Sequence, residues 1–131
     1  EKALKQTLKK REKESVRLRK LQKHFFDKVQ KEIPEVKING SINKRLPNNI
    51  NICLPNNNAE FLVIALDEKG IACASMSACR NITEKDFSYV VEALDQKCAD
   101  SSLRFSMGRD TSKYDINKTI KVLKKLVLKQ K

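Results

Sequence analysis

The chain has 131 residues, of which 40% are hydrophobic and 34% are charged, a composition typical of one soluble globular domain. No apolar run reaches the length of a membrane-spanning helix, which excludes an integral membrane protein. The formal net charge of +12 is uneven: residues 1–33 carry 12 Lys or Arg against 5 Asp or Glu, and residues 113–131 carry 7 Lys against one acid. This excess indicates either a nucleic-acid-binding surface or the solvated faces of lysine-rich helices. The second is favoured, because no base-reading motif accompanies the charge.

A long helix is predicted over residues 1–33. Its apolar residues recur at helical spacing, and charged residues fill the other faces. Pro34 ends the helix, because its ring cannot continue the hydrogen-bond ladder. We expect so long a helix with a narrow apolar stripe to need a partner along its length. The stripe consists of Leu4, Leu8, Leu18, Leu21, Phe25 and Val29.

The middle of the chain predicts two strands and a helix. Residues 36–38 form a short strand that ends at an Asn39-Gly40 turn signal, and residues 50–54 form a half-buried strand that Pro55 ends. Asparagines at positions 56–58 are N-cap candidates for a helix over residues 59–67. The residues expected on the buried face of that helix are Phe61, Leu62, Ile64 and Ala65.

The second half predicts two more strands and two more helices. Residues 71–73 and 102–107 are the strands, and Arg104 and Ser106 lie on the strand face opposite Leu103 and Phe105. A helix is expected over residues 84–95, with Phe87, Val90, Val91 and Leu94 pointing inward. Another begins near Ser112, and its buried stripe comprises Ile116, Ile120, Leu123 and Val127.

The element order after the first helix is therefore β-β-α-β-α-β-α. It predicts an α+β fold: a small antiparallel or mixed sheet with helices packed on it, preceded by a long N-terminal helix.

The four cysteines occupy positions 53, 73, 79 and 98. No Cys-x-x-Cys pair occurs and the one histidine, His24, is distant, so no metal site is predicted. Reduced thiols in a cytoplasm are the default, and Cys53 and Cys73 are expected to be buried packing residues.

Two polar features are candidates for chemistry. Cys79 lies in a loop of small residues beside Arg80, where access and a nearby positive charge favour the thiolate. Arg104 lies within a strand, where a guanidinium needs an anionic partner such as a carboxylate. A structural salt bridge of Arg104 and an inert Cys79 are the competing interpretations.

Several segments together resemble cysteine desulfurases of the NifS/IscS type, in the class V aminotransferase family. Residues 70–79, Gly-Ile-Ala-Cys-Ala-Ser-Met-Ser-Ala-Cys, are similar to that family's Ser-x-Gly-Ser-Ala-Cys loop. Residues 101–109, Ser-Ser-Leu-Arg-Phe-Ser-Met-Gly-Arg, resemble its Ser-Ser-x-Arg-Phe-Ser-x-Gly-Arg segment. Residues 46–52 resemble its Pro-Asn-x-x-Asn strand entry, and residues 36–40 its Asn-Gly hairpin. Order and spacing agree across roughly residues 14–128.

The resemblance implies the C-terminal small domain of a fold-type I enzyme that uses pyridoxal phosphate (PLP) to convert L-cysteine to L-alanine. Cys79 would then be the catalytic residue, which takes the substrate sulfur as a persulfide and passes it to iron–sulfur scaffold or tRNA-thiolation acceptor proteins. Arg104 would bind the substrate carboxylate, and Asn48 would lie near the substrate. A cytoplasmic homodimer without a membrane or nucleic-acid partner is the expected full-length form.

Two departures from the family pattern limit what this chain would do alone. Met76 replaces the family's loop glycine, and no Ser-x-His-Lys segment supplies the Schiff-base lysine. We therefore expect residues 1–34 to be an inter-domain helix and residues 35–131 to be the small domain. The PLP-binding large domain is absent from this chain, so no cofactor-binding residue is assigned in it. A basic nucleic-acid-binding module and a related PLP enzyme such as a selenocysteine lyase remain the alternatives.

Overall fold

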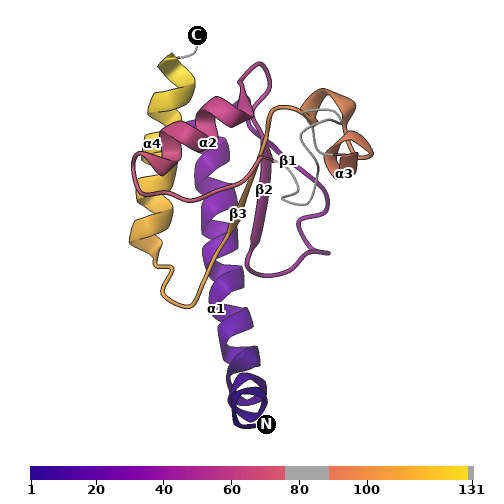
Figure 1. The fold of residues 1–131 in the computed structure, drawn as a ribbon, viewed down its shortest axis with the longest axis vertical. Coiled ribbons are helices and arrows are strands. Elements are labelled where there is room, and N and C mark those ends of the chain that lie inside the picture. The colour runs from indigo at the N-terminus through magenta and orange to yellow at the C-terminus, as the bar shows by residue number, and fades with distance from the viewer. Residues whose placement is uncertain (76–88, 130–131) are drawn as a thin grey trace.

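The computed structural model describes residues 1–75 and 89–129. Along the described chain, the helices, strands and one short 3₁₀ helix (η1) follow in the order α1 (Lys2–Glu32), β1 (Lys37–Ile38), β2 (Asn49–Cys53), α2 (Ala59–Asp67), α3 (Tyr89–Glu92), η1 (Gln96–Cys98), β3 (Ser102–Ser106) and α4 (Lys113–Lys129). The predicted α+β fold with a long N-terminal helix is confirmed (Figure 1).

The three strands form an antiparallel sheet in the order β1-β2-β3. Cross-strand partners share a face, so the sheet has an apolar face and a polar face. The apolar face carries the pairs Ile50–Phe105 and Ile52–Leu103, and the polar face carries Asn49–Ser106 and Asn51–Arg104.

Helices α1 and α4 lie side by side and cover the apolar face of the sheet (Figure 1). The Phe25 ring of α1 contacts the Phe105 ring of β3 at a centroid distance of 5.8 Å. The predicted stripe of α4 is buried in full, and Ile120 and Leu123 have no exposed surface. The first part of α1 extends past the sheet, and Leu4 and Leu8 are 63% and 54% exposed.

The strand predicted at residues 71–73 is wrong. Helix α2 ends in a turn in which Gly70 takes a φ of +71°, and the Ile71 N–H bonds the Leu66 carbonyl at 3.0 Å. That N–H therefore belongs to the helix end rather than to a sheet. The segment meets the sheet at Ala74, which forms an isolated two-bond bridge with the backbone of Arg104.

The predicted inward faces of two helices are also partly wrong. In α2 the buried residues are Ala59, Leu62, Ala65 and Leu66, whereas Phe61 and Ile64 are exposed. The helix is rotated because Leu62 and Leu66, one turn apart, contact the core beneath.

The helix predicted over 84–95 is a single turn in its described part, α3. Val91 is buried, and Val90 and Leu94 are exposed. Asp95 N–H bonds the Val91 carbonyl at 2.8 Å, and the chain then turns into η1, so the helical pattern ends early. Phe87 lies outside the described residues.

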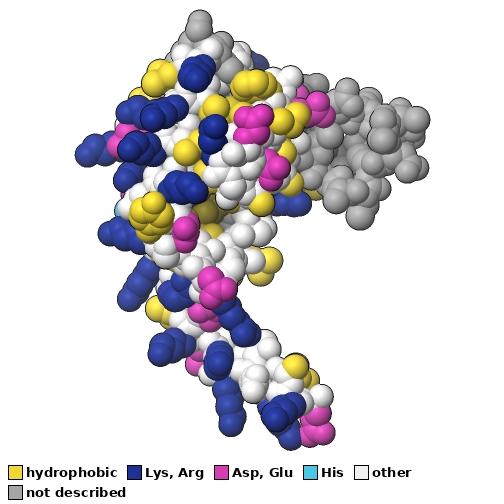
Figure 2. Space-filling model, turned by 60° about the vertical axis from the view of Figure 1, so that its left-hand side comes forward, with side chains coloured by type: hydrophobic (Ala, Val, Ile, Leu, Met, Phe, Trp, Pro, Cys, Tyr) yellow, Lys and Arg dark blue, Asp and Glu magenta, His cyan; other side chains and the backbone are white. Residues whose placement is uncertain are grey.

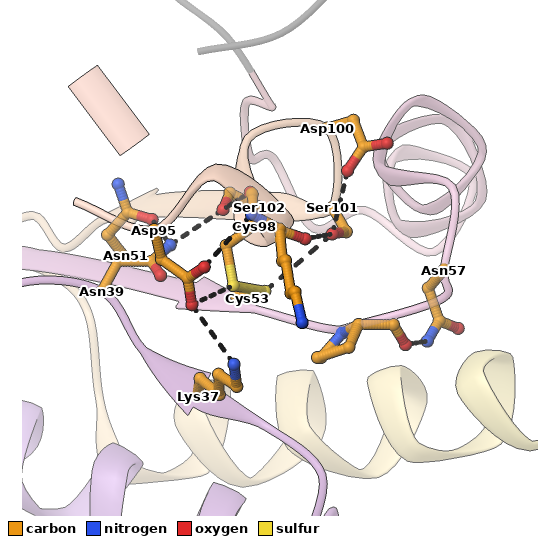
Figure 3. The surroundings of a disulfide bond; sticks show 12 residues. Lys37, Asn39, Asn51, Cys53, Asn57, Asp95, Cys98, Asp100, Ser101 and Ser102 are labelled. Carbon is orange, nitrogen blue, oxygen red and sulfur yellow. Dashed lines mark hydrogen bonds and ion pairs between the residues drawn. A yellow bond between two sulfur atoms is a disulfide. The ribbon is translucent and has the colours of Figure 1, made fainter. Parts of the chain in front are cut away.

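Cys53 and Cys98 form a disulfide, so the prediction of reduced thiols is wrong for this pair. Both side chains are fully buried, and their Cα atoms are 5.5 Å apart, an ordinary spacing for this bond. Cys53 points to the polar face of the sheet, where η1 brings Cys98 against it (Figure 3). Cys73 is a free thiol and half-buried.

Candidate active site

Arg104 occupies the middle of β3 on the polar face of the sheet. Its neighbours Leu103 and Phe105 are buried on the opposite face, so strand alternation directs the guanidinium away from the core. The side chain is exposed, and it makes no hydrogen bond or ion pair with any described residue. Its backbone is fixed on both sides, by Asn51 of β2 and by Ala74. The structural salt bridge, the competing interpretation of Arg104, is therefore not found within the described part of the chain.

Asn48 lies directly before β2 and is half-buried. Its carbonyl accepts a hydrogen bond from the Met107 N–H at 2.9 Å, which fixes it beside the end of β3. Asn51, the strand partner of Arg104, is three residues further along the chain, which places it about 10 Å from Asn48 along the sheet. The fold thus brings Asn48 and Arg104 to the same two strands, but not into contact.

Gln22 of α1 anchors the loop that carries Asn48. Its side chain is 4% exposed, and Nε2 donates to the carbonyls of Leu46 at 2.9 Å and Asn49 at 2.7 Å. Gln22 lies four residues after Leu18 and three before Phe25, so it falls on the apolar stripe of the helix. A polar residue at such a position needs hydrogen-bond partners when it is buried, and this is the signal that could have identified its role from sequence.

Arg17 of α1 anchors the loop after β3 in the same way. Its guanidinium donates to the carbonyls of Thr111 at 2.6 Å and Gly108 at 2.9 Å, and pairs with Glu14 through two hydrogen bonds. The hydrogen bond from Arg17 lowers the pKa of Glu14, and the same bond raises the pKa of Arg17. The long helix therefore holds both loops that flank the polar face, a function that helical periodicity alone does not reveal.

A hollow of about 1130 Å³ lies between the first half of α1 and the loop that carries Asn48. Val16, Leu18 and Leu46 contribute apolar surface to it, and Arg109 contributes charge. Asn48 thus borders open space, as a residue that contacts a substrate must.

Arg45 is partly buried against α1, with its guanidinium 5.1 Å from the centre of the Phe26 ring. It donates to the carbonyls of Ser41 at 2.7 Å and of Asn39. Burial lowers the pKa of Arg45. These contacts hold the loop between β1 and β2 and leave Arg45 a structural residue.

Polar side chains surround the Cys53–Cys98 disulfide (Figure 3). Asn39 Nδ2 donates to Asn51 Oδ1 at 2.9 Å and to Ser102 Oγ at 2.8 Å. Since Asn51 is the strand partner of Arg104, this network extends to the candidate site.

Cys79, the predicted catalytic residue, lies outside the described residues. Cys73 is a poor nucleophile, because burial and the charge of Asp67 raise the pKa of its thiol to about 11. Among residues 1–75 and 89–129, no group of three His, Cys, Asp or Glu side chains could hold a metal ion. No helix in those segments is long and apolar enough to cross a membrane.

Comparison with known proteins gives consistent matches. The model of the family "Aminotransferase class-V" matches residues 3–119. Cysteine desulfurase IscS from Dictyoglomus turgidum is 35% identical over 120 residues, covering 90% of this chain and 30% of that protein. A probable mitochondrial cysteine desulfurase from Dictyostelium discoideum is 39% identical over 111 residues, covering 80% and 24%.

Two solved structures share the fold. A NifS-like protein from Rickettsia africae superposes with a TM-score of 0.68 at 25% identity, over 89% of this chain and 29% of that one. A second NifS-like protein reaches a TM-score of 0.80 over 97% of this chain at 15% identity, which is evidence for the fold alone. The chain spans about a third or less of the length of these proteins.

Proposed function

This chain belongs to the aminotransferase class-V family, and from that premise we propose that it forms the C-terminal part of a cysteine desulfurase. The enzyme would release sulfur from L-cysteine, leave L-alanine, and pass the sulfur to acceptor proteins. One observation carries the proposal: the Arg104 guanidinium is exposed and without a partner among the described residues, on a strand whose backbone is fixed on both sides.

Arg104 would bind the carboxylate of L-cysteine. A guanidinium matches a carboxylate through two parallel hydrogen bonds, and a rigid strand limits the entropy lost when the pair forms. Asn48 would contact the substrate from the neighbouring loop, which Gln22 holds in place. We assign Cys79 as the sulfur acceptor: its thiolate would attack the substrate sulfur and become a persulfide, while the C–S bond breaks and leaves its electron pair on the carbon that is protonated to the methyl group of L-alanine.

The described residues do not fit a PLP site by themselves. PLP enzymes of this kind bind the cofactor through a lysine in an enclosed, phosphate-binding pocket. No described lysine is buried, and the sequence lacks the family's Ser-x-His-Lys segment. We therefore propose that residues 1–34 join this small domain to a cofactor domain elsewhere in the enzyme, and that the enzyme is a cytoplasmic homodimer.

The test uses the full-length enzyme that carries this chain. We expect Cys79→Ser to abolish sulfide release and persulfide formation while the absorbance of the bound cofactor is unchanged. Cys73→Ser is the matched control and should retain activity. A Cys79→Ser enzyme with undiminished desulfurase activity would refute the assignment.

Arg104→Ala should mainly weaken substrate binding. Breaking one side of a charge pair costs about 2–5 kcal/mol, so KM for L-cysteine should rise at least about 30-fold. Arg104→Lys should recover part of this loss, because it keeps the charge without the bidentate geometry. An unchanged KM in Arg104→Ala would contradict the proposed role.

A further inference from the structure

Helices α1 and α4 run in the same direction and are joined by polar contacts along their shared edge. Asn117 of α4 accepts hydrogen bonds from His24 Nε2 at 3.0 Å and Lys28 Nζ at 2.8 Å of α1. Two turns further on, Lys124 pairs with Glu32 at 2.7 Å. The two most basic segments of the sequence therefore form one continuous surface.

Lysines from both helices meet along this edge. Lys121 lies between Asn117 and Lys124 at i+4 and i+7 spacing, so it projects toward the same side, and Lys125 follows it by one turn. On α1, Lys20 and Lys31 flank the contacts of His24 and Lys28. We call this surface the basic face; it comprises Lys20, Lys28, Lys31, Lys121, Lys124 and Lys125. Figure 2 shows Lys and Arg side chains gathered along this flank of the molecule.

Few acids neutralise the basic face. Glu32 neutralises one lysine of this face, Lys124, whereas Asp27 pairs with Lys23 outside it. Asp115 accepts hydrogen bonds from Ser112 at the start of α4. Lys20, Lys31, Lys121 and Lys125 are exposed and make no hydrogen bond or ion pair within the described segments.

We propose that the basic face binds the phosphodiester backbone of a nucleic acid without reading its sequence. Flexible lysines act as point charges on phosphates, and their positions need not match base edges. A protein partner fits less well, since protein interfaces are depleted of lysine and centre on buried aromatic or apolar anchors. The pI of about 9.7 and the arrangement along one flank are typical of an electrostatic footprint for nucleic acid.

This surface is independent of the proposed desulfurase site. Helices α1 and α4 cover the apolar face of the sheet, whereas Arg104 lies on the polar face. Loss of nucleic-acid binding would therefore leave the desulfurase proposal intact, and loss of desulfurase activity would leave this one intact.

The test measures binding of the full-length enzyme that carries this chain, by fluorescence anisotropy of a labelled duplex of about 20 base pairs, as DNA and as RNA. With the four lysines of the basic face that make no described contact placed on phosphates, affinity should fall on the order of 10²-fold between 50 and 200 mM salt. The triple variant Lys31→Gln, Lys121→Gln, Lys125→Gln keeps Lys20 alone of these four, so it should bind more weakly, and its affinity should fall only about 3- to 4-fold over the same salt range.

A matched control removes the same charge elsewhere: Lys44→Gln, Lys69→Gln and Lys97→Gln change exposed lysines outside α1 and α4. The control should keep the wild-type salt dependence. Similar affinity for the DNA and RNA duplexes supports recognition of the phosphate backbone. A preference for one duplex identifies which nucleic acid the basic face binds. The proposal would be overturned if the enzyme did not bind the duplex at 50 mM salt, or if the control triple variant lost as much affinity as the basic-face variant. It would also be overturned if poly-L-glutamate displaced the enzyme as well as an unlabelled duplex does.

Discussion

Gln22→Met tests whether α1 holds the loop that carries Asn48. The substitution preserves the length and approximate volume of a side chain that is 4% exposed, so the cavity contribution should be small. It removes two hydrogen bonds, to the carbonyls of Leu46 and Asn49. The Leu46 carbonyl keeps a bond from the Asn49 N–H at 3.1 Å, so the main cost falls on the second carbonyl. We expect a loss of about 2 kcal/mol in the free energy of unfolding.

Urea denaturation followed by circular dichroism measures this loss. With a slope of about 2 kcal/mol per molar urea, the midpoint should fall by about 1 M. Gln30→Met is the matched control, because Gln30 is exposed on the same helix and its substitution should change stability by less than about 0.5 kcal/mol. If the Gln22 and Gln30 variants unfold at the same urea concentration, the buried hydrogen bonds do not anchor the loop.

Two further predictions concern the cysteines. Cys53→Ala with Cys98→Ala should lower stability by about 4 kcal/mol, because the bond closes a loop with a sequence separation of 45. Four titratable thiols in the denatured, unreduced protein, rather than two, would show that the bond is absent. The second prediction concerns Cys73 in a Cys79→Ser variant. Burial raises the pKa of the Cys73 thiol to about 11, so the thiol stays protonated below that pH. Its alkylation by iodoacetamide should therefore be slow from pH 7 to 9 and accelerate toward pH 11. In urea the same thiol should react with an ordinary pKa of about 8.5, and an identical pH profile in the folded protein would contradict its burial.

The sequence predicted well what depends on local chemistry. Pro34 ended the first helix, the asparagines before residue 59 supplied an N-cap at Asn58, and alternation placed Arg104 on the polar face. The Phe61 N–H donates to Asn58 Oδ1 at 2.9 Å, and this cap bond is the interaction that the sequence pattern implied.

The errors lie where distant segments decide the outcome. The strand at residues 71–73 had the right composition, but the end of α2 takes its first N–H group. The Cys53–Cys98 bond depends on η1 folding onto β2 across 45 residues, which no spacing rule reveals. Arg17 resembled an ordinary polar residue of a solvated helix until the loop that it binds was placed beside it.

The disulfide also changes how the chain responds to cutting. Because Cys53 and Cys98 are bonded, a single peptide cleavage anywhere between them leaves one covalent molecule. A sample that a protease has cut once between these two cysteines would keep its full mass on a non-reducing gel. It would separate into two fragments after reduction. Residues 54–97, which include Cys79, thus form a closed ring that a single nick opens without releasing either end.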